Sequence, residues 1–242
     1  MNEVIKQLIE RKSVRAYEDR EISREEKELI LTAAVNAPTA GNQQMYTIID
    51  VTDQSIKDKL AVSCDNQPFI AEAKMILIFC ADSRKWYDAF ICAGASPDKP
   101  GYGDILLDVT DAVIAAQNAV TAAESLGIGS CYIGDILEKY EYHKELLSLP
   151  DFVFPAAMVV FGYPTDQQKN REKPARVPLK HVVHENSYRL MDNAELREMF
   201  KEKTSSRGFD DWMKAFCTRK YNSDFAKEMD RSVKEMFKTL DE

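Results

Sequence analysis

The sequence has few residues of the kinds that bind metals or form disulfide bonds. Its five cysteines are scattered without a C-x-x-C pair, and it contains three histidines. We find no plausible set of metal ligands and no plausible catalytic triad, so we interpret His143, His181 and His184 as structural or surface residues. Scattered, unpaired cysteines are typical of a reducing compartment.

Cationic residues are also in the minority. The chain of 242 residues has 32 lysines and arginines against 40 aspartates and glutamates, which gives a net charge of −8. A nucleic-acid-binding protein needs a broad cationic surface, so this composition argues against that class. Cations that cluster against an acidic background favour a small anionic ligand instead.

Long hydrophobic runs are scarce as well. No apolar run approaches the roughly 20 residues of a membrane span, and residues 1–10 are amphipathic and partly acidic, unlike a signal peptide. Hydrophobic residues make up 45% of the chain, which suffices for a packed core. We expect a cytoplasmic protein that binds neither membrane nor nucleic acid.

Local patterns predict a mixture of helices and strands. A stripe formed by Val4, Ile5, Leu8 and Ile9 predicts a short first helix, and Ser23 with Glu26 forms a capping box for a second helix that ends before Pro38. Apolar or β-rich runs predict strands over 45–51, 75–81 and 156–163. Further helices are expected over 55–64, 104–126, 192–203, 209–218 and 223–240.

Four segments are harder to interpret. We expect 84–103 to be an irregular surface excursion or lid with aromatic anchors, and 166–178 to be a polar loop. The helix over 104–126 is apolar around most of its circumference, which either a core position or a subunit interface explains. Gly127–Gly134 is rich in glycine but is not G-x-G-x-x-G and follows a helix, so it is no dinucleotide fingerprint.

Arg11, Ser13 and Arg15 alternate near the N-terminus. In an extended segment such residues point the same way, and guanidinium groups bind phosphate oxygens through charge-assisted hydrogen bonds. The pattern indicates a phosphate clamp, although a solvated basic turn explains it too. Lys173 and Arg176 offer a second cationic set from a distant loop.

The sequence also contains what the ring of flavin mononucleotide (FMN) needs. Side-chain amides can donate and accept hydrogen bonds at the ring edge, and Asn42, Gln44 and Gln67 lie in expected turns. The glycines of 129–134 would let backbone approach the flat face. Each feature alone also fits a turn amide or a loop glycine, and the order in which they occur is the stronger signal.

That order resembles the nitroreductase and flavin reductase family, in particular the larger NADPH-dependent oxygen-insensitive nitroreductases. The similar segments span most of residues 1–190 and weaken beyond it. They are Arg-Lys-Ser-Val-Arg-Ala-Tyr (11–17), Ala-Pro-Thr-Ala-Gly-Asn-Gln-Gln-Met-Tyr (37–46), Asn-Gln-Pro-Phe (66–69), Gly-Ser-Cys-Tyr-Ile-Gly (129–134), Lys-Pro-Ala-Arg-Val-Pro (173–178) and Val-His-Glu-Asn-Ser-Tyr (183–188).

The resemblance implies an α+β, nitroreductase-like fold, with a central, mainly antiparallel sheet wrapped by helices. It also implies an intertwined homodimer with two FMN sites at the subunit interface. Residues 1–190 would form the FMN-binding domain, and 191–242 a helical extension of the same domain that contributes dimer and substrate-pocket contacts.

The same resemblance implies which residues bind FMN. The phosphate, ribityl and pyrimidine regions would be held from two segments, the ring would be lined by two turns, and its face and reactive edge would meet a third segment. These residues are, in that order, Arg11, Lys12, Ser13, Arg15, Lys173 and Arg176; Pro38, Thr39, Ala40, Asn42, Gln44 and Gln67; and Tyr132, Ile133 and Gly134. Ala175 interrupts the usual Lys-Pro-Arg of the family, so which of Lys173 and Arg176 contacts the phosphate stays open.

The implied activity is two-electron reduction of nitroaromatics or quinones by ping-pong hydride transfer from NAD(P)H through FMN. No side chain would be a catalytic nucleophile, and Arg15 would tune the flavin electrostatically. Arg207 is a candidate for the NADPH 2′-phosphate, or simply an arginine on a polar turn. Alternatives are an NAD(P)H:FMN reductase that supplies free reduced flavin, a flavin-dependent dehydrogenase, a non-catalytic flavin-binding protein and a scaffold.

Overall fold

The computed structural model describes residues 1–241 and divides into two compact units. The first contains Met1–Arg171 and the chain from Glu228 onward, and the second contains Glu172–Lys227. This division differs from the expected boundary at residue 190, and the roles expected for 1–190 and 191–242 stay predictions. Each unit is described by itself.

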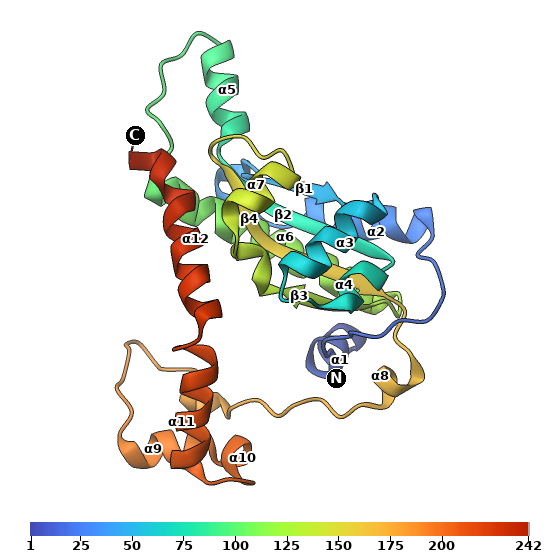
Figure 1. Ribbon diagram of the computed structural model, residues 1–242, viewed down its shortest axis with the longest axis vertical. Coiled ribbons are helices and arrows are strands. Elements are labelled where there is room, and N and C mark those ends of the chain that lie inside the picture. Colours follow the sequence, from blue (N-terminus) through green and yellow to red (C-terminus); the bar gives the residue numbers. More distant parts are fainter. Residues whose placement is uncertain (242) are drawn as a thin grey trace. The chain divides into compact units, whose positions relative to one another are not determined.

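A four-stranded antiparallel sheet forms the centre of the first unit (Figure 1). Its strands follow the order β1-β2-β4-β3, so β1 and β3 lie at opposite edges. The prediction of a central, mainly antiparallel sheet is therefore confirmed. The strands are β1 (Tyr46–Asp50), β2 (Met75–Asp82), β3 (Gly129–Ile133) and β4 (Val153–Gly162).

Helices cover both faces of this sheet, which explains why β2 is an unbroken apolar run. Leu77 and Phe79 pack in one core cluster with residues of α2 (Arg24–Val35) and α6 (Tyr102–Ser125). Ile76 and Ile78 point to the opposite face, where they pack in a second cluster with α3 (Gln54–Ser63) and α4 (Pro68–Glu72). Alternation along a strand requires this division.

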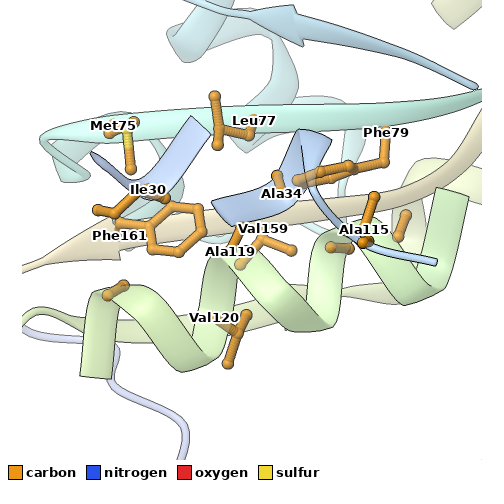
Figure 2. Packing of buried hydrophobic residues seen from close by; sticks show 14 of the residues in the cluster. Ile30, Ala34, Met75, Leu77, Phe79, Ala115, Ala119, Val120, Val159 and Phe161 are labelled. Carbon is orange, nitrogen blue, oxygen red and sulfur yellow. The ribbon is translucent and has the colours of Figure 1, made fainter. Parts of the chain in front are cut away.

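Helix α6 lies close to the sheet because much of its buried face is alanine. Ala115 and Ala119 are fully buried and pack in the same cluster as Val159 and Phe161 of β4 (Figure 2). By length and hydropathy α6 could also cross a membrane, which differs from our expectation that no apolar run is long enough. In this fold it is a core helix packed on α2 and the sheet.

The N-terminal segment runs from α1 (Glu3–Glu10) along the free side of β3. Ser13 forms a parallel bridge with Ser130, and Tyr17 an antiparallel bridge with Pro164. The segment approaches so closely that a Cβ at Gly129 would lie 2.5 Å from Val14 Cγ2. Glycine is needed there because carbon atoms attract best at about 3.5–4.0 Å.

Local signals for caps were accurate. Ser23 Oγ accepts a hydrogen bond from Glu26 N at 3.1 Å, and a Glu26 carboxylate oxygen accepts one from Ser23 N at 2.8 Å. Gly127 adopts φ +75° just after α6, as its place at the helix end predicts.

Three segments for which no helix or strand was expected contain one. The glycine-rich stretch 127–134 contains the strand β3, in which Gly129 allows the close approach of Val14. The excursion at 84–103 begins with α5 (Arg84–Cys92), in which Arg84 and Asp88 form an ion pair of 2.7 Å one helical turn apart. None of its residues is buried, and Trp86 Nε1 donates to Gln43 O at 2.8 Å, which agrees with a surface excursion held by aromatic residues. The expected polar loop begins with α8 (Asp166–Asn170), because Thr165 caps its first turn.

The remaining elements are short or lie near the C-terminus. The first unit also contains η1 (Ala40–Asn42), η2 (Gly134–Leu137), α7 (Tyr140–Leu146) and, from Glu228 onward, α12 (Asp224–Asp241). The second unit contains η3 (Leu179–His181), α9 (Asn193–Met199), α10 (Lys201–Thr204) and α11 (Phe209–Lys220). The single helix expected over 192–203 is thus two short helices.

Candidate functional site

The clamp segment 11–15 is extended and held against the edge of β3. Val14 N donates to Ser130 O at 2.9 Å, and the Val14 side chain is only 4% exposed. Since neighbours in an extended segment alternate, Ser13 and Arg15 face away from the core that contains Val14. The structure therefore provides the extended geometry that a clamp by Arg11, Ser13 and Arg15 requires.

Two buried polar atoms near this segment have no hydrogen-bond partner within residues 1–241. They are Arg11 Nε and Ser130 Oγ, and Ser130 is fully buried beside its bridge partner Ser13. Leaving a buried donor unsatisfied costs about 1–3 kcal/mol. A bound oxyanion would satisfy such donors, so these residues fit a phosphate group.

Lys12 is used differently from its neighbours. Its Nζ donates to Lys169 O at 2.7 Å and to Arg171 O at 2.5 Å, and Arg171 donates to Ser13 O at 2.6 Å. These bonds hold the end of α8 against the clamp. The ammonium group of Lys12 is thus already bound by backbone carbonyls, and its expected contact with FMN stays a prediction.

A second group of expected residues meets at the other end of β3. The Arg15 guanidinium lies 5.9 Å from the centre of the Phe69 ring. Gln67, two residues before Phe69, donates from Nε2 to Cys64 O at 2.8 Å and to Asp135 Oδ2 at 2.9 Å. The fold thereby brings Arg15 and the Gln67 turn to the end of β3, where Asp135 follows Gly134.

The three expected residues at this end of β3 differ in what they can present. Tyr132 donates from its hydroxyl to Gln117 Oε1 at 3.4 Å, and burial raises its pKa to about 12. Ile133 is buried in the core, so its backbone is the part that a ligand could meet. A Cβ built on Gly134 meets no atom within 4 Å among the described residues, so this position is open.

Hydrogen bonds hold the loop before β1, residues 38–44, in its conformation. Thr39 Oγ1 accepts a hydrogen bond from Gln44 N at 3.1 Å, and Gln44 Nε2 donates to Val35 O at 3.0 Å. Asn42 adopts φ +57°, a conformation in which asparagine is enriched. The side chain of Gln44 thus stabilises the loop itself, while Thr39, Ala40 and Asn42 lie on its 3-10 turn.

Asp111 of α6 anchors this loop. Its carboxylate accepts from Ala40 N at 3.0 Å and from Met45 N at 3.4 Å, and it is 2% exposed. One turn away, Asp108 is fully buried beside Ser83, and desolvation raises its pKa to about 7.

The clamp and the loop lie on opposite edges of the sheet. The loop leads into β1 at one edge, whereas the clamp lies beyond β3 at the other. Four strand spacings separate them, which corresponds to roughly 19 Å across the sheet. Within one chain, the sheet therefore separates the loop from the clamp.

The remaining candidates belong to the second unit. Lys173 and Arg176 precede η3, and Arg176 lines a cavity of about 190 Å³ with Pro178 and Met199. Their convergence with the clamp stays a prediction.

Arg207 lines a cavity of about 370 Å³ with Trp212, Phe216 and Arg219. Trp212 and Phe216 are stacked, with ring centres 4.7 Å apart, and the Arg219 guanidinium lies 5.4 Å from the Phe216 ring centre. Arg207 therefore belongs to a pocket of arginine and aromatic residues rather than standing alone on a polar turn.

The histidines differ in their surroundings. His143 is fully buried, with Nε2 2.8 Å from Ser63 Oγ and Nδ1 3.1 Å from Ile136 O, and burial lowers its pKa. Its structural interpretation is consistent with these contacts. His184 Nδ1 accepts from Arg189 N at 3.1 Å.

The sequence analysis missed Ser130, Asp111 and Asp135. Asp111 lies with Asp108 within the largely apolar stretch 104–126, and this is a signal that could have identified it, because an aspartate buried among apolar residues needs hydrogen-bond donors. Asp135 and Ser130 carry no comparable signal, since polar residues beside glycines are common in turns.

Comparison with models of known protein families matches residues 8–163 to the nitroreductase family. The chain belongs to the nitroreductase family. This confirms the resemblance inferred from the motifs, and the solved structures similar to this chain confirm the nitroreductase-like fold.

Named relatives cover nearly the whole of this nitroreductase-family chain. It is 32% identical over 246 residues to an FMN reductase [NAD(P)H] of Bacillus subtilis, covering 99% of this chain and 93% of that protein. It is 33% identical over 220 residues to an oxygen-insensitive NADPH nitroreductase of Salmonella typhimurium, covering 88% of each. The structure of NfrA2 from B. megaterium superposes with a TM-score of 0.82 at 33% identity, covering 98% of both chains.

Proposed function

We propose that this protein reduces nitroaromatic compounds and quinones in two-electron steps with NAD(P)H as the donor. Its broader class is that of an FMN-dependent NAD(P)H oxidoreductase, in agreement with its family and with relatives named FMN reductase and NADPH nitroreductase. FMN supplies the hydride-accepting and hydride-donating chemistry when bound. The chain's own residues bind FMN, orient it and polarise its ring.

The observation that carries the proposal is the pair of buried, unpartnered polar atoms at the clamp. Arg11 Nε and Ser130 Oγ lie on two paired segments, next to the cationic and hydroxyl groups of Ser13 and Arg15. This combination suits a phosphate dianion. Lys173 and Arg176 are proposed to complete the phosphate site.

The ring of FMN is proposed to lie at the end of β3. Gln67 supports this because it is fixed beside Asp135, and Gly134 supports it because no described side chain or backbone atom crowds it. Arg15 approaches the same region over Phe69. A cation there favours the reduced flavin, which is anionic along its pyrimidine edge, so Arg15 is proposed to tune the potential.

A homodimer is proposed because the sheet separates two expected parts of one site. Thr39, Ala40, Asn42 and Gln44 lie at the β1 edge, and the clamp lies beyond the β3 edge. A second copy of the chain can place its loop against the first copy's clamp, with no internal movement. The exposed apolar side chains of α1, which include Val4 and Leu8, are suited to such an interface.

The nicotinamide donor is proposed to be NADPH, with Arg207 as the 2′-phosphate ligand. The pocket around Arg207 supports this assignment because it pairs two arginines with the stacked Trp212 and Phe216. Guanidinium groups suit the phosphate, and aromatic faces suit a purine ring. We further propose that the protein is cytoplasmic and that oxidised acceptor enters the pocket after NADP⁺ has left, which gives ping-pong kinetics.

A second candidate function is reduction of free FMN, which the name of the B. subtilis relative supports. Turnover with nitrofurazone, benzoquinone and free FMN distinguishes the two. Parallel double-reciprocal lines and higher kcat/KM for nitrofurazone or benzoquinone are the expected result. Higher kcat/KM for free FMN would instead identify a flavin reductase.

The absorbance spectrum of the purified protein before and after anaerobic NADPH addition tests the class itself. Flavin bands that bleach on addition are expected. Bands that persist would indicate a non-catalytic flavin-binding protein, and a colourless protein that takes up no added FMN would contradict the whole proposal.

A further inference from the structure

The carboxylate of Asp135 accepts a hydrogen bond from Gln67, a residue expected to contact the flavin. Asp135 is the second residue of η2, directly after Gly134, and its Oδ2 accepts a hydrogen bond from Gln67 Nε2 at 2.9 Å. The two residues are 68 positions apart in sequence. The bond therefore depends on the packing of the Gln67 turn against the end of β3.

The two acceptors around Gln67 determine which way its amide faces. Cys64 O and the Asp135 carboxylate can only accept hydrogen bonds, so the atom that meets both must be the NH₂ group. Both amide hydrogens of Gln67 are used in this way. Oε1, which can only accept, is the atom left to meet a ligand.

The backbone of Gln67 is equally fixed. Gln67 N donates to Ala61 O at 2.9 Å, and Pro68 follows as the first residue of α4. Asp65 and Asn66 adopt φ values of +62° and +50°, which closes the turn after α3. With the main chain held, the orientation of the amide depends on its side-chain contacts.

We propose that Asp135 is a positioning residue that makes Gln67 a hydrogen-bond acceptor for the flavin. This inference rests on the proposed binding of FMN at this end of β3. On the pyrimidine edge of a flavin, the two carbonyl oxygens accept and N3–H is the single donor. An oriented Gln67 Oε1 therefore selects N3–H and disfavours a ring that lacks this proton.

Methylation of N3 removes that donor, so 3-methyl-FMN is the probe. Fluorescence titration of the flavin-free full-length chain gives the dissociation constants of FMN and 3-methyl-FMN. We expect the native protein to bind FMN at least about tenfold more tightly than 3-methyl-FMN. This ratio corresponds to the loss of one hydrogen bond that leaves Gln67 Oε1 unsatisfied.

Variants at position 135 then test the role of the carboxylate. In Asp135→Ala the Gln67 amide can turn away, and the ratio of the two dissociation constants falls below about threefold. Asp135→Asn keeps an acceptor oxygen and retains the native ratio. Asp65→Asn, which removes a carboxylate from the same turn without touching the Gln67 amide, serves as the matched control and also retains it.

The outcomes separate the inference from the proposed function. An Asp135→Ala variant that binds FMN and keeps the native ratio overturns the positioning role, and so does an Asp135→Asn variant that loses the ratio as fully as Asp135→Ala. A native protein that binds FMN without preferring it over 3-methyl-FMN also overturns it while leaving the proposed function intact. Binding of neither flavin by the native protein contradicts the proposed function instead.

Discussion

Replacing Gly129 with alanine should damage the clamp without touching any of its polar groups. The new Cβ would lie 2.5 Å from Val14 Cγ2, 2.8 Å from Val14 Cβ and 3.1 Å from Val14 Cγ1. Comfortable carbon contacts begin near 3.5 Å, so the segment must retreat from β3 by about 1 Å. Val14 lies between Ser13 and Arg15, and both move with it.

The magnitude follows from overpacking and from the lost alignment. Forcing an extra methyl into a packed site costs about 1–3 kcal/mol, which for a chain of this size lowers Tm by roughly 2–12 °C. Loss of one well-aligned, charge-assisted hydrogen bond to the phosphate weakens FMN binding about tenfold or more.

Thermal unfolding and FMN titration of Gly129→Ala measure both effects. Gly103→Ala is the matched control, because a Cβ there meets no described atom within 4 Å. It should lower neither the Tm nor the affinity for FMN. Adding Val14→Ala should restore part of the loss, since it removes two of the three crowded atoms. A Gly129→Ala protein with native FMN affinity would refute the link between Val14 packing and the clamp.

Three further substitutions test other parts of the site. Arg15→Ala should lower the two-electron midpoint potential of bound FMN by roughly 20–90 mV, the range for a unit charge at ~4 Å between effective dielectrics of ~80 and ~20; an unchanged potential in FMN-replete protein would remove its tuning role. Arg207→Ala should raise the KM for NADPH far more than that for NADH, and an equal change in both would exclude a 2′-phosphate contact. Asp108 has a pKa raised to about 7, so the folded state holds a proton that the unfolded state releases between about pH 4 and pH 7, and stability falls as pH rises through that window. Asp108→Asn should therefore gain Tm relative to the native protein on going from pH 5 to pH 8, and a pH-independent difference would contradict the assigned pKa.

Local sequence signals predicted most of the elements that build the sheet and its cover. The run 75–81 became β2, the stretch 104–126 became most of α6, and the capping box at Ser23 began α2. These signals work because burial and capping act within a few residues of their cause. The strand at 129–133 escaped detection because its glycine content reflects close packing against Val14, which a distant segment imposes.

The sequence suggested a set of candidate residues for the site but little of their geometry. Arg11, Ser13 and Arg15 share an extended segment, as their alternation implies, but the same pattern does not reveal that the Lys12 ammonium binds Lys169 O and Arg171 O. Gln67 was a candidate because of its turn, whereas Asp135, which accepts a hydrogen bond from the Gln67 amide, was not.

The order of short motifs along the chain was sufficient to indicate the family, because a motif can be read from its residue types without knowing where the folded chain places it. The direction in which those residues point is a property of packing. Strand order puts the loop 38–44 and the clamp on opposite edges of the sheet. The packing of the turn at 64–67 against η2 gives the Gln67 amide its two acceptors, Cys64 O and Asp135 Oδ2. Such contacts join residues far apart in sequence, and they exist once the core that holds both has formed.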